Sequence, residues 1–133
     1  MILVDTSVWV LVLRDANGSA ADALRSRIGP EVDVLCRFSQ LELLQGARDE
    51  REWRLLVEYL DTQIYLEASG RTWREAARIY FDLRRKGLTV GSPVDCCIAQ
   101  VALENGVRLL HRDRDFEAIA RVRPLEQVYF DWN

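Results

Sequence analysis

The chain has 133 residues, of which 49% are hydrophobic and 29% charged, and its formal net charge is −3. This length suits one ordinary domain with its own core and is too short for two. The balance is that of a globular protein, no apolar run approaches the roughly 20 residues that cross a bilayer, and the first residues lack the regions of an export signal.

Three cysteines, Cys36, Cys96 and Cys97, argue against a disulfide framework. Their number is odd and two of them are adjacent, and neither spacing fits a zinc ribbon or finger. We therefore expect buried thiols in a reducing cytoplasm.

Apolar runs and helical spacing alternate along the whole chain. Strands are expected at 2–4, 33–36, 63–66, 107–110 and 127–130. Helices are expected at about 6–14, 19–28, 38–48, 53–60, 73–83, 92–105 and 116–120. This alternation predicts an α/β fold, a parallel sheet of about five strands wrapped by helices on both faces.

Asp5 directly follows the first strand, Ile2-Leu-Val4, which has no polar alternation and is therefore expected to be buried on both faces. A carboxylate at the carboxyl end of such a strand points into the crevice where open α/β sheets bind ligands. Asp5 is equally suited to be the N-cap of the next helix. This stretch alone does not decide between the two.

Glu42 lies within Phe38-Ser-Gln-Leu-Glu-Leu-Leu-Gln-Gly46, between leucines. A glutamate in such a place is more often a solvated helix residue than a ligand, so its role depends on what lies near it. Gln45 and Gly46, one turn on, are polar or small neighbours that would let a ligand or another backbone approach.

Asp95 follows Ser92 and Pro93 at the start of a predicted helix, where it can complete a capping box. It also shares a helical face with Ile98, Ala99 and Ala102. A capping aspartate normally faces water, so this inward position favours a functional site.

Asp113 and Asp115 follow the strand at 107–110. Asp115 precedes Phe116 and is a natural N-cap for the last helix, whereas Asp113 has no such local role. In a doubly wound sheet the first and fourth strands commonly flank the point where the strand order reverses, which would bring Asp5 and Asp113 together with Asp95 nearby.

Several carboxylates in one crevice repel one another unless a cation neutralises them. Oxygen ligands without a histidine or cysteine cluster select a hard divalent ion, Mg²⁺ or Mn²⁺. Such an ion is typically used on phosphates, where it orients a phosphodiester and generates hydroxide for in-line attack.

Four stretches of this chain resemble the PIN-domain ribonucleases, and most closely the VapC toxins of bacterial toxin–antitoxin pairs. They are Ile2-Leu-Val-Asp-Thr-Ser7, Ser39-Gln-Leu-Glu-Leu-Leu-Gln-Gly46, Val94-Asp-Cys-Cys-Ile-Ala99 and Leu109-Leu-His-Arg-Asp-Arg-Asp-Phe116. Each motif is weak alone, but four in the family's order over nearly the whole chain are fairly specific. The resemblance implies a single PIN domain over 1–133.

The resemblance also implies an acidic metal site formed by Asp5, Glu42, Asp95 and Asp113. Thr6 or Ser7 would support this site, and Asp115 would be a structural residue or one in the second layer around the metal. The implied activity is Mg²⁺-dependent endonucleolytic cleavage of RNA that leaves 5′-phosphate and 3′-hydroxyl ends. A homodimer and a neutralising VapB-type antitoxin are implied as well.

His111, the only histidine, stands where many relatives carry threonine. A polar residue at a strand end is the favoured interpretation, and a proton shuttle and a phosphate contact are the alternatives.

Seventeen of the eighteen basic residues are arginine, which suits bidentate phosphate contacts, although codon usage is the favoured explanation for this composition. The basic residues that flank the acids or cluster at a helix end are candidate RNA contacts: Arg112, Arg114, Arg84, Arg85 and Lys86.

Large apolar groups on the helices at 53–60 and 73–83 predict a surplus of exposed apolar surface that a homodimer would bury.

A response-regulator receiver would need a lysine after its fifth strand, and the only lysine, Lys86, ends a helix. A phosphatase of the haloacid-dehalogenase type would need Asp-x-Asp where Asp5-Thr-Ser7 stands. A PIN nuclease outside a toxin–antitoxin pair and a non-catalytic PIN binding module remain as alternatives.

Overall fold

A computed structural model describes residues 1–132, in which five strands form one parallel sheet of order β3-β2-β1-β4-β5. The strands are Ile2–Val4 (β1), Asp33–Cys36 (β2), Tyr65–Leu66 (β3), Arg108–His111 (β4) and Gln127–Tyr129 (β5). The register places Leu3 of the central strand opposite Val34 on one side and Leu109 on the other. The predicted parallel sheet of about five strands is confirmed.

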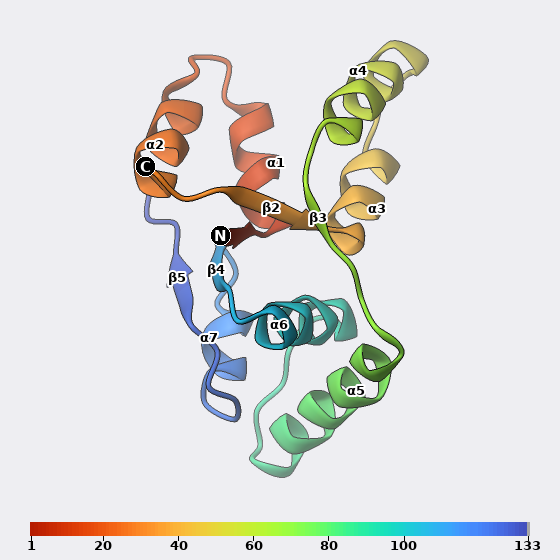
Figure 1. The fold of residues 1–133 in the computed structure, drawn as a ribbon, viewed down its shortest axis with the longest axis vertical. Coiled ribbons are helices and arrows are strands. Elements are labelled where there is room, and N and C mark those ends of the chain that lie inside the picture. The colour runs from red at the N-terminus through yellow and green to blue at the C-terminus, as the bar shows by residue number, and fades with distance from the viewer. Residues whose placement is uncertain (133) are drawn as a thin grey trace.

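Helices cover both faces of this sheet, as predicted from the sequence. They are Thr6–Arg14 (α1), Ser19–Ile28 (α2), Arg37–Gln45 (α3), Glu50–Asp61 (α4), Gly70–Arg85 (α5), Pro93–Asn105 (α6) and Asp115–Ile119 (α7). Helices α1 to α4 lie on one side of the strands and α5 to α7 on the other (Figure 1). Among residues 1–132, no helix has both the length and the apolar character needed to cross a bilayer.

Strand β1 is buried on both faces, which explains its continuous apolar run. Ile2, Leu3 and Val4 are each at most 1% exposed. Leu3 packs in the core under α5 to α7, whereas Ile2 and Val4 pack in the core under α1 to α4. Successive side chains of β1 point to opposite faces of the sheet, so this one short strand contributes to two separate cores.

Several element boundaries differ from those expected. Helix α3 ends at Gln45 instead of continuing to Arg48, and the third strand has only two residues. Strand β4 runs from Arg108 to His111, one residue later at each end than expected, and His111 is a fully buried strand residue. Helix α7 begins at Asp115 with Arg114 at its N-cap, which makes the expected N-cap role of Asp115 wrong.

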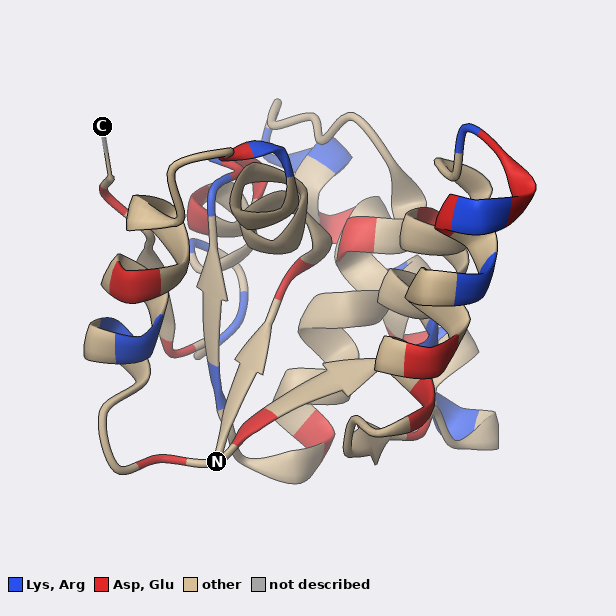
Figure 2. Cartoon of the chain, turned by 90° about the horizontal axis from the view of Figure 1, so that it is seen from above, with Lys and Arg blue, Asp and Glu red and all other residues tan. Residues whose placement is uncertain are grey.

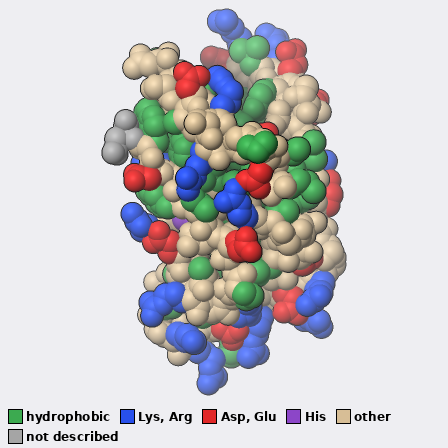
Figure 3. Space-filling model, turned by 60° about the vertical axis from the view of Figure 1, so that its left-hand side comes forward, with side chains coloured by type: hydrophobic (Ala, Val, Ile, Leu, Met, Phe, Trp, Pro, Cys, Tyr) green, Lys and Arg blue, Asp and Glu red, His purple; other side chains and the backbone are tan. Residues whose placement is uncertain are grey.

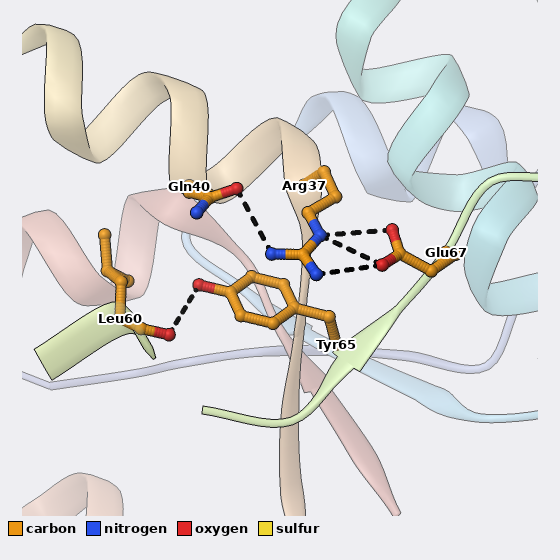
Figure 4. Close-up of polar contacts among 5 residues, drawn as sticks. All are labelled: Arg37, Gln40, Leu60, Tyr65 and Glu67. Carbon is orange, nitrogen blue, oxygen red and sulfur yellow. Dashed lines mark hydrogen bonds and ion pairs between the residues drawn. The ribbon is translucent and has the colours of Figure 1, made fainter. Parts of the chain in front are cut away.

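The short edge strand β3 is held by side chains as well as by its backbone ladder (Figure 4). The Arg37 guanidinium donates from Nε and Nη2 to the Glu67 carboxylate at 2.9–3.1 Å and stacks 3.8 Å from the ring centroid of Tyr65. The Tyr65 hydroxyl donates to the Leu60 carbonyl at 2.9 Å, which ties the strand to the end of α4. These contacts add side-chain support to a strand of only two residues.

Candidate metal centre

Asp5 and Asp113 lie at the carboxyl ends of two neighbouring central strands. The β1–β4 register pairs Val4 with Leu110, and the ladder continues one step further because the Asp5 amide donates to the Leu110 carbonyl at 2.9 Å. The strand order reverses between these two strands, which is where open α/β sheets bind their ligands. Acidic positions gather near the ends of the central strand arrows in Figure 2.

Asp5 is both a helix cap and a buried acid at the crevice. Its Oδ2 accepts from the backbone N–H of Ser7 at 3.0 Å and from the Ser7 hydroxyl at 2.5 Å, and only 4% of the residue is exposed. Burial raises the pKa of Asp5, although the bonds from Ser7 oppose this rise. The Ser7 hydroxyl also accepts from the Arg112 amide at 2.9 Å, so Ser7 links the ends of β1 and β4.

Asp95, Asp113 and Asp115 form the tightest acidic group within residues 1–132. Each offers a carboxylate oxygen, and the three oxygens lie within 4.8 Å of one another. The partial burial of Asp95, followed by the charges of its acidic neighbours, raises its pKa to about 8. A carboxyl with such a pKa is one whose ionised form needs a nearby cation.

The segment that follows β4 and the segment that precedes α6 are linked and held by backbone donors. The Asp115 amide donates to Asp113 Oδ1 at 2.9 Å, and the Gly91 amide donates to Asp115 Oδ2 at 2.8 Å. Ser92 caps α6 by accepting from the Val94 amide at 3.1 Å. The capping-box bond from Asp95 to the Ser92 amide does not occur in the described part of the chain, so the Asp95 carboxylate stays free for the cluster.

Glu42 stands beside this group, not within it. Its Oε1 accepts from the Thr6 hydroxyl at 2.9 Å, and the side chain is half-buried. Burial and then the charge of Asp5 raise the pKa of Glu42, with the bond from Thr6 acting against them. The charges of both Asp5 and Glu42 also raise the pKa of Asp95, so all five acids act on one crevice.

This donor set fits a hard divalent cation. It consists of carboxylate oxygens alone, with no histidine or cysteine in the described cluster. Asp95, Asp113 and Asp115 would hold the ion directly, with Asp5 and Glu42 within reach as further charges. The family resemblance implied only a supporting role for Asp115, and the signal for its place in the cluster is the Asp-x-Asp spacing after β4.

The two candidate RNA-binding arginines after β4 differ in what they contact. Arg112 donates from Nη1 to the carbonyls of Phe130 and Trp132 at 3.1 and 2.7 Å, so part of its guanidinium holds the C-terminal segment. Arg114 is exposed, pairs with Glu117 at 2.8 Å and lies 4.4 Å from the Tyr129 ring centroid.

The other three candidates are exposed and lie at the C-terminal end of α5: Arg84, Arg85 and its C-cap Lys86. Basic side chains gather at the lower end of the face shown in Figure 3.

A groove of about 1060 Å³ between α1, α2, α3 and α4 was not predicted from the sequence. Its lining includes the apolar residues Trp9, Leu24, Leu55 and Tyr59, and Glu42 also lines it. Leu55 and Tyr59 are 56% and 41% exposed and are spaced by four residues on α4. These two apolar side chains share a face of α4, and their four-residue spacing is the sequence signal that could have revealed the groove.

The family model described as "PIN domain" matches residues 2–122. Ribonuclease VapC11 of Mycobacterium tuberculosis is 37% identical across 98% of this chain and 99% of that protein. Ribonuclease VapC21 of the same species is 33% identical across 80% of this chain and 83% of that protein.

Among solved structures, VapBC2 from Rickettsia felis bound to a fragment of its promoter DNA has a TM-score of 0.78 at 18% identity, over 98% of this chain and all of that one. VapC20 of Mycobacterium tuberculosis, a toxin that cleaves the sarcin–ricin loop, has a TM-score of 0.64 at 22% identity, over 89% of this chain and 94% of that one. These two likenesses concern the fold.

Proposed function

The chain belongs to the PIN-domain family, and within it to the VapC ribonucleases, and from this premise we propose that it is the endoribonuclease toxin of a toxin–antitoxin pair. The substrate is RNA, the reaction is hydrolysis of a phosphodiester bond, and the chain 1–133 acts as one PIN domain in the cytoplasm. The observation that carries the proposal is the meeting of Asp95, Asp113 and Asp115 within 4.8 Å at the crevice beside Asp5.

The proposed site uses Asp5, Glu42, Asp95 and Asp113, as expected from the sequence, together with Asp115. When bound, Mg²⁺ or Mn²⁺ would supply charge for the phosphate and a hydroxide for in-line attack. The chain's own part is to hold the carboxylates: Ser7 fixes Asp5 and Thr6 fixes Glu42. Cleavage would leave 5′-phosphate and 3′-hydroxyl ends.

The groove between α1 and α4 supports a VapB-like antitoxin as partner. Its apolar lining suits the apolar face of a helix, and Glu42 connects the groove to the acidic crevice. A segment that leaves the groove at this end would place an arginine fork on the carboxylates and displace metal and substrate together. The gene upstream of this one is expected to encode such a partner, which distinguishes a toxin from a PIN nuclease that acts alone.

Exposed aromatic and aliphatic residues on α3 and α5 support a homodimer. Trp73 is 57% exposed and packs edge-on against Phe38 at 5.7 Å, and Leu41 is 62% exposed. A twofold interface over this surface would bury these residues. A monodisperse monomer at micromolar concentration would contradict this part of the proposal.

The direct test is to sequence the cleavage ends formed when purified protein acts on total RNA with Mg²⁺ or Mn²⁺. Cleavage should require the ion and be lost in Asp95→Asn, because a carboxamide does not neutralise the metal's charge. The metal-free variant should be no less stable than the original, most clearly above pH 8, where the ionised Asp95 of the original is repelled by its acidic neighbours. Normal cleavage by Asp95→Asn would show that Asp95 is only part of the helix start and that the site is wrong.

A further inference from the structure

His111 is the last residue of β4 and is completely buried. Its ring lies between Phe116, at 5.0 Å between ring centroids, and Tyr129, at 5.8 Å. A ring enclosed in this way cannot reach a substrate or exchange protons with one. Its function must therefore pass through the groups that its two nitrogens contact.

The hydrogen bonds around His111 determine which nitrogen carries the proton. The Asp113 backbone N–H points at Nδ1, at 3.2 Å, and an amide can only donate. Nδ1 must then be the unprotonated acceptor, so the proton of the neutral ring lies on Nε2. Nε2–H in turn donates to the Gln127 side-chain oxygen on β5.

We propose that His111 is a positioning residue that holds the backbone of Asp113 for metal binding. Its Nδ1 fixes the Asp113 amide, Asp113 Oδ1 accepts from the Asp115 amide, and Asp115 Oδ2 accepts from the Gly91 amide. A single chain of hydrogen bonds thus runs from Gln127 on the edge strand, through His111, to two of the three clustered acids. This inference rests on the proposed metal site, because it concerns the geometry of that site's ligands.

Two substitutions separate the two nitrogens. In His111→Asn, the side-chain oxygen reaches about the place of Nδ1, so the acceptor for the Asp113 amide is kept and the contact with Gln127 is lost. In His111→Gln, the longer side chain reaches about the place of Nε2, so the opposite contact is kept. Both variants remove the ring next to Phe116, and the shorter Asn leaves the larger packing defect, so a higher metal affinity of His111→Asn would not result from better packing.

The measurement is Mn²⁺ affinity by calorimetry, together with hydrogen exchange of the Asp113 amide by NMR. His111→Gln should bind Mn²⁺ roughly tenfold or more weakly, as when a group that orients a metal ligand is lost, and its Asp113 amide should exchange faster. His111→Asn should recover most of the affinity and the protection. Equal affinity in both variants, whether retained or lost, would overturn the positioning role.

Asp113→Asn distinguishes this inference from the function on which it rests. If the original protein binds Mn²⁺ no better than Asp113→Asn does, there is no metal site at this crevice and the inference falls with it. If the original protein binds Mn²⁺ through Asp113 but the two His111 variants do not differ, the metal site stands and only the role of His111 is refuted.

Discussion

The two faces of the sheet are packed to very different degrees. Under α5 to α7 the core is closed, and Ile79, Ile98 and Ala99 are completely buried. Over α1 to α4 the helices leave a groove of about 1060 Å³, where Leu55 and Tyr59 stay exposed. The strands do not cause this difference, because β1 is equally buried on both sides. Helices α1 to α4 do not close over their side of the sheet. An apolar groove that stays exposed in a chain of this size indicates a binding site for a partner.

The largest expected effect tests this comparison by stability. Ile98→Ala on the closed face should lower the free energy of unfolding by about 2–5 kcal/mol, because it leaves a cavity in a packed core. Leu55→Ala on the open face should change it by less than about 0.5 kcal/mol, because that side chain is already in water. Urea unfolding of the two variants measures both. Similar losses would mean that the groove is closed in solution.

Next in size is the effect of the groove on partner binding. Tyr59→Ala should weaken binding of the antitoxin by roughly tenfold or more, because a large aromatic residue in an apolar groove is a common binding hot spot. Phe81→Ala is the matched control, an exposed aromatic residue on α5 outside the groove. Calorimetry with the protein encoded upstream gives both affinities. A larger effect from Phe81→Ala would place the partner on the other face.

The acidic crevice lies where the two faces meet, and it should respond to pH through Asp95. The pKa of this carboxyl is about 8 in the folded metal-free protein and about 3.8 in a free side chain. The folded state therefore holds a proton that the unfolded state has lost, so stability falls as pH rises from about 4 to 8. Thermal unfolding in EDTA should show this fall, and the difference from Asp95→Asn isolates it from other groups.

Metal binding should show the opposite dependence on pH. Because the ion must displace the Asp95 proton, Mn²⁺ affinity should rise by about tenfold per pH unit between pH 6 and 8 and then level off. Calorimetry across this range measures the slope. An affinity that does not change with pH would mean that Asp95 is already ionised without the metal.

Much of the fold and part of the site could be predicted because the signals are local. Unbroken apolar runs gave the strands, and Asp5 and Asp113 could be placed together because parallel strands end at one edge. The burial of His111 could not be predicted, because it depends on Phe116 and on Tyr129 from a distant strand. The groove was missed for the same reason, since it depends on how far apart helices settle.

The smallest expected effect distinguishes two arginines in the loop after β4, Arg112 and Arg114. Arg114 is exposed, so Arg114→Ala should reduce the dependence of RNA affinity on salt by about one unit in a log–log plot, as for the loss of one phosphate contact. Arg112 holds the carbonyls of Phe130 and Trp132, so Arg112→Ala should instead lower the unfolding temperature and leave the salt slope nearly unchanged. Binding of a short RNA to the metal-free protein at several salt concentrations distinguishes the two. If Arg112→Ala changes the slope and Arg114→Ala does not, the RNA backbone passes on the side of the C-terminal segment.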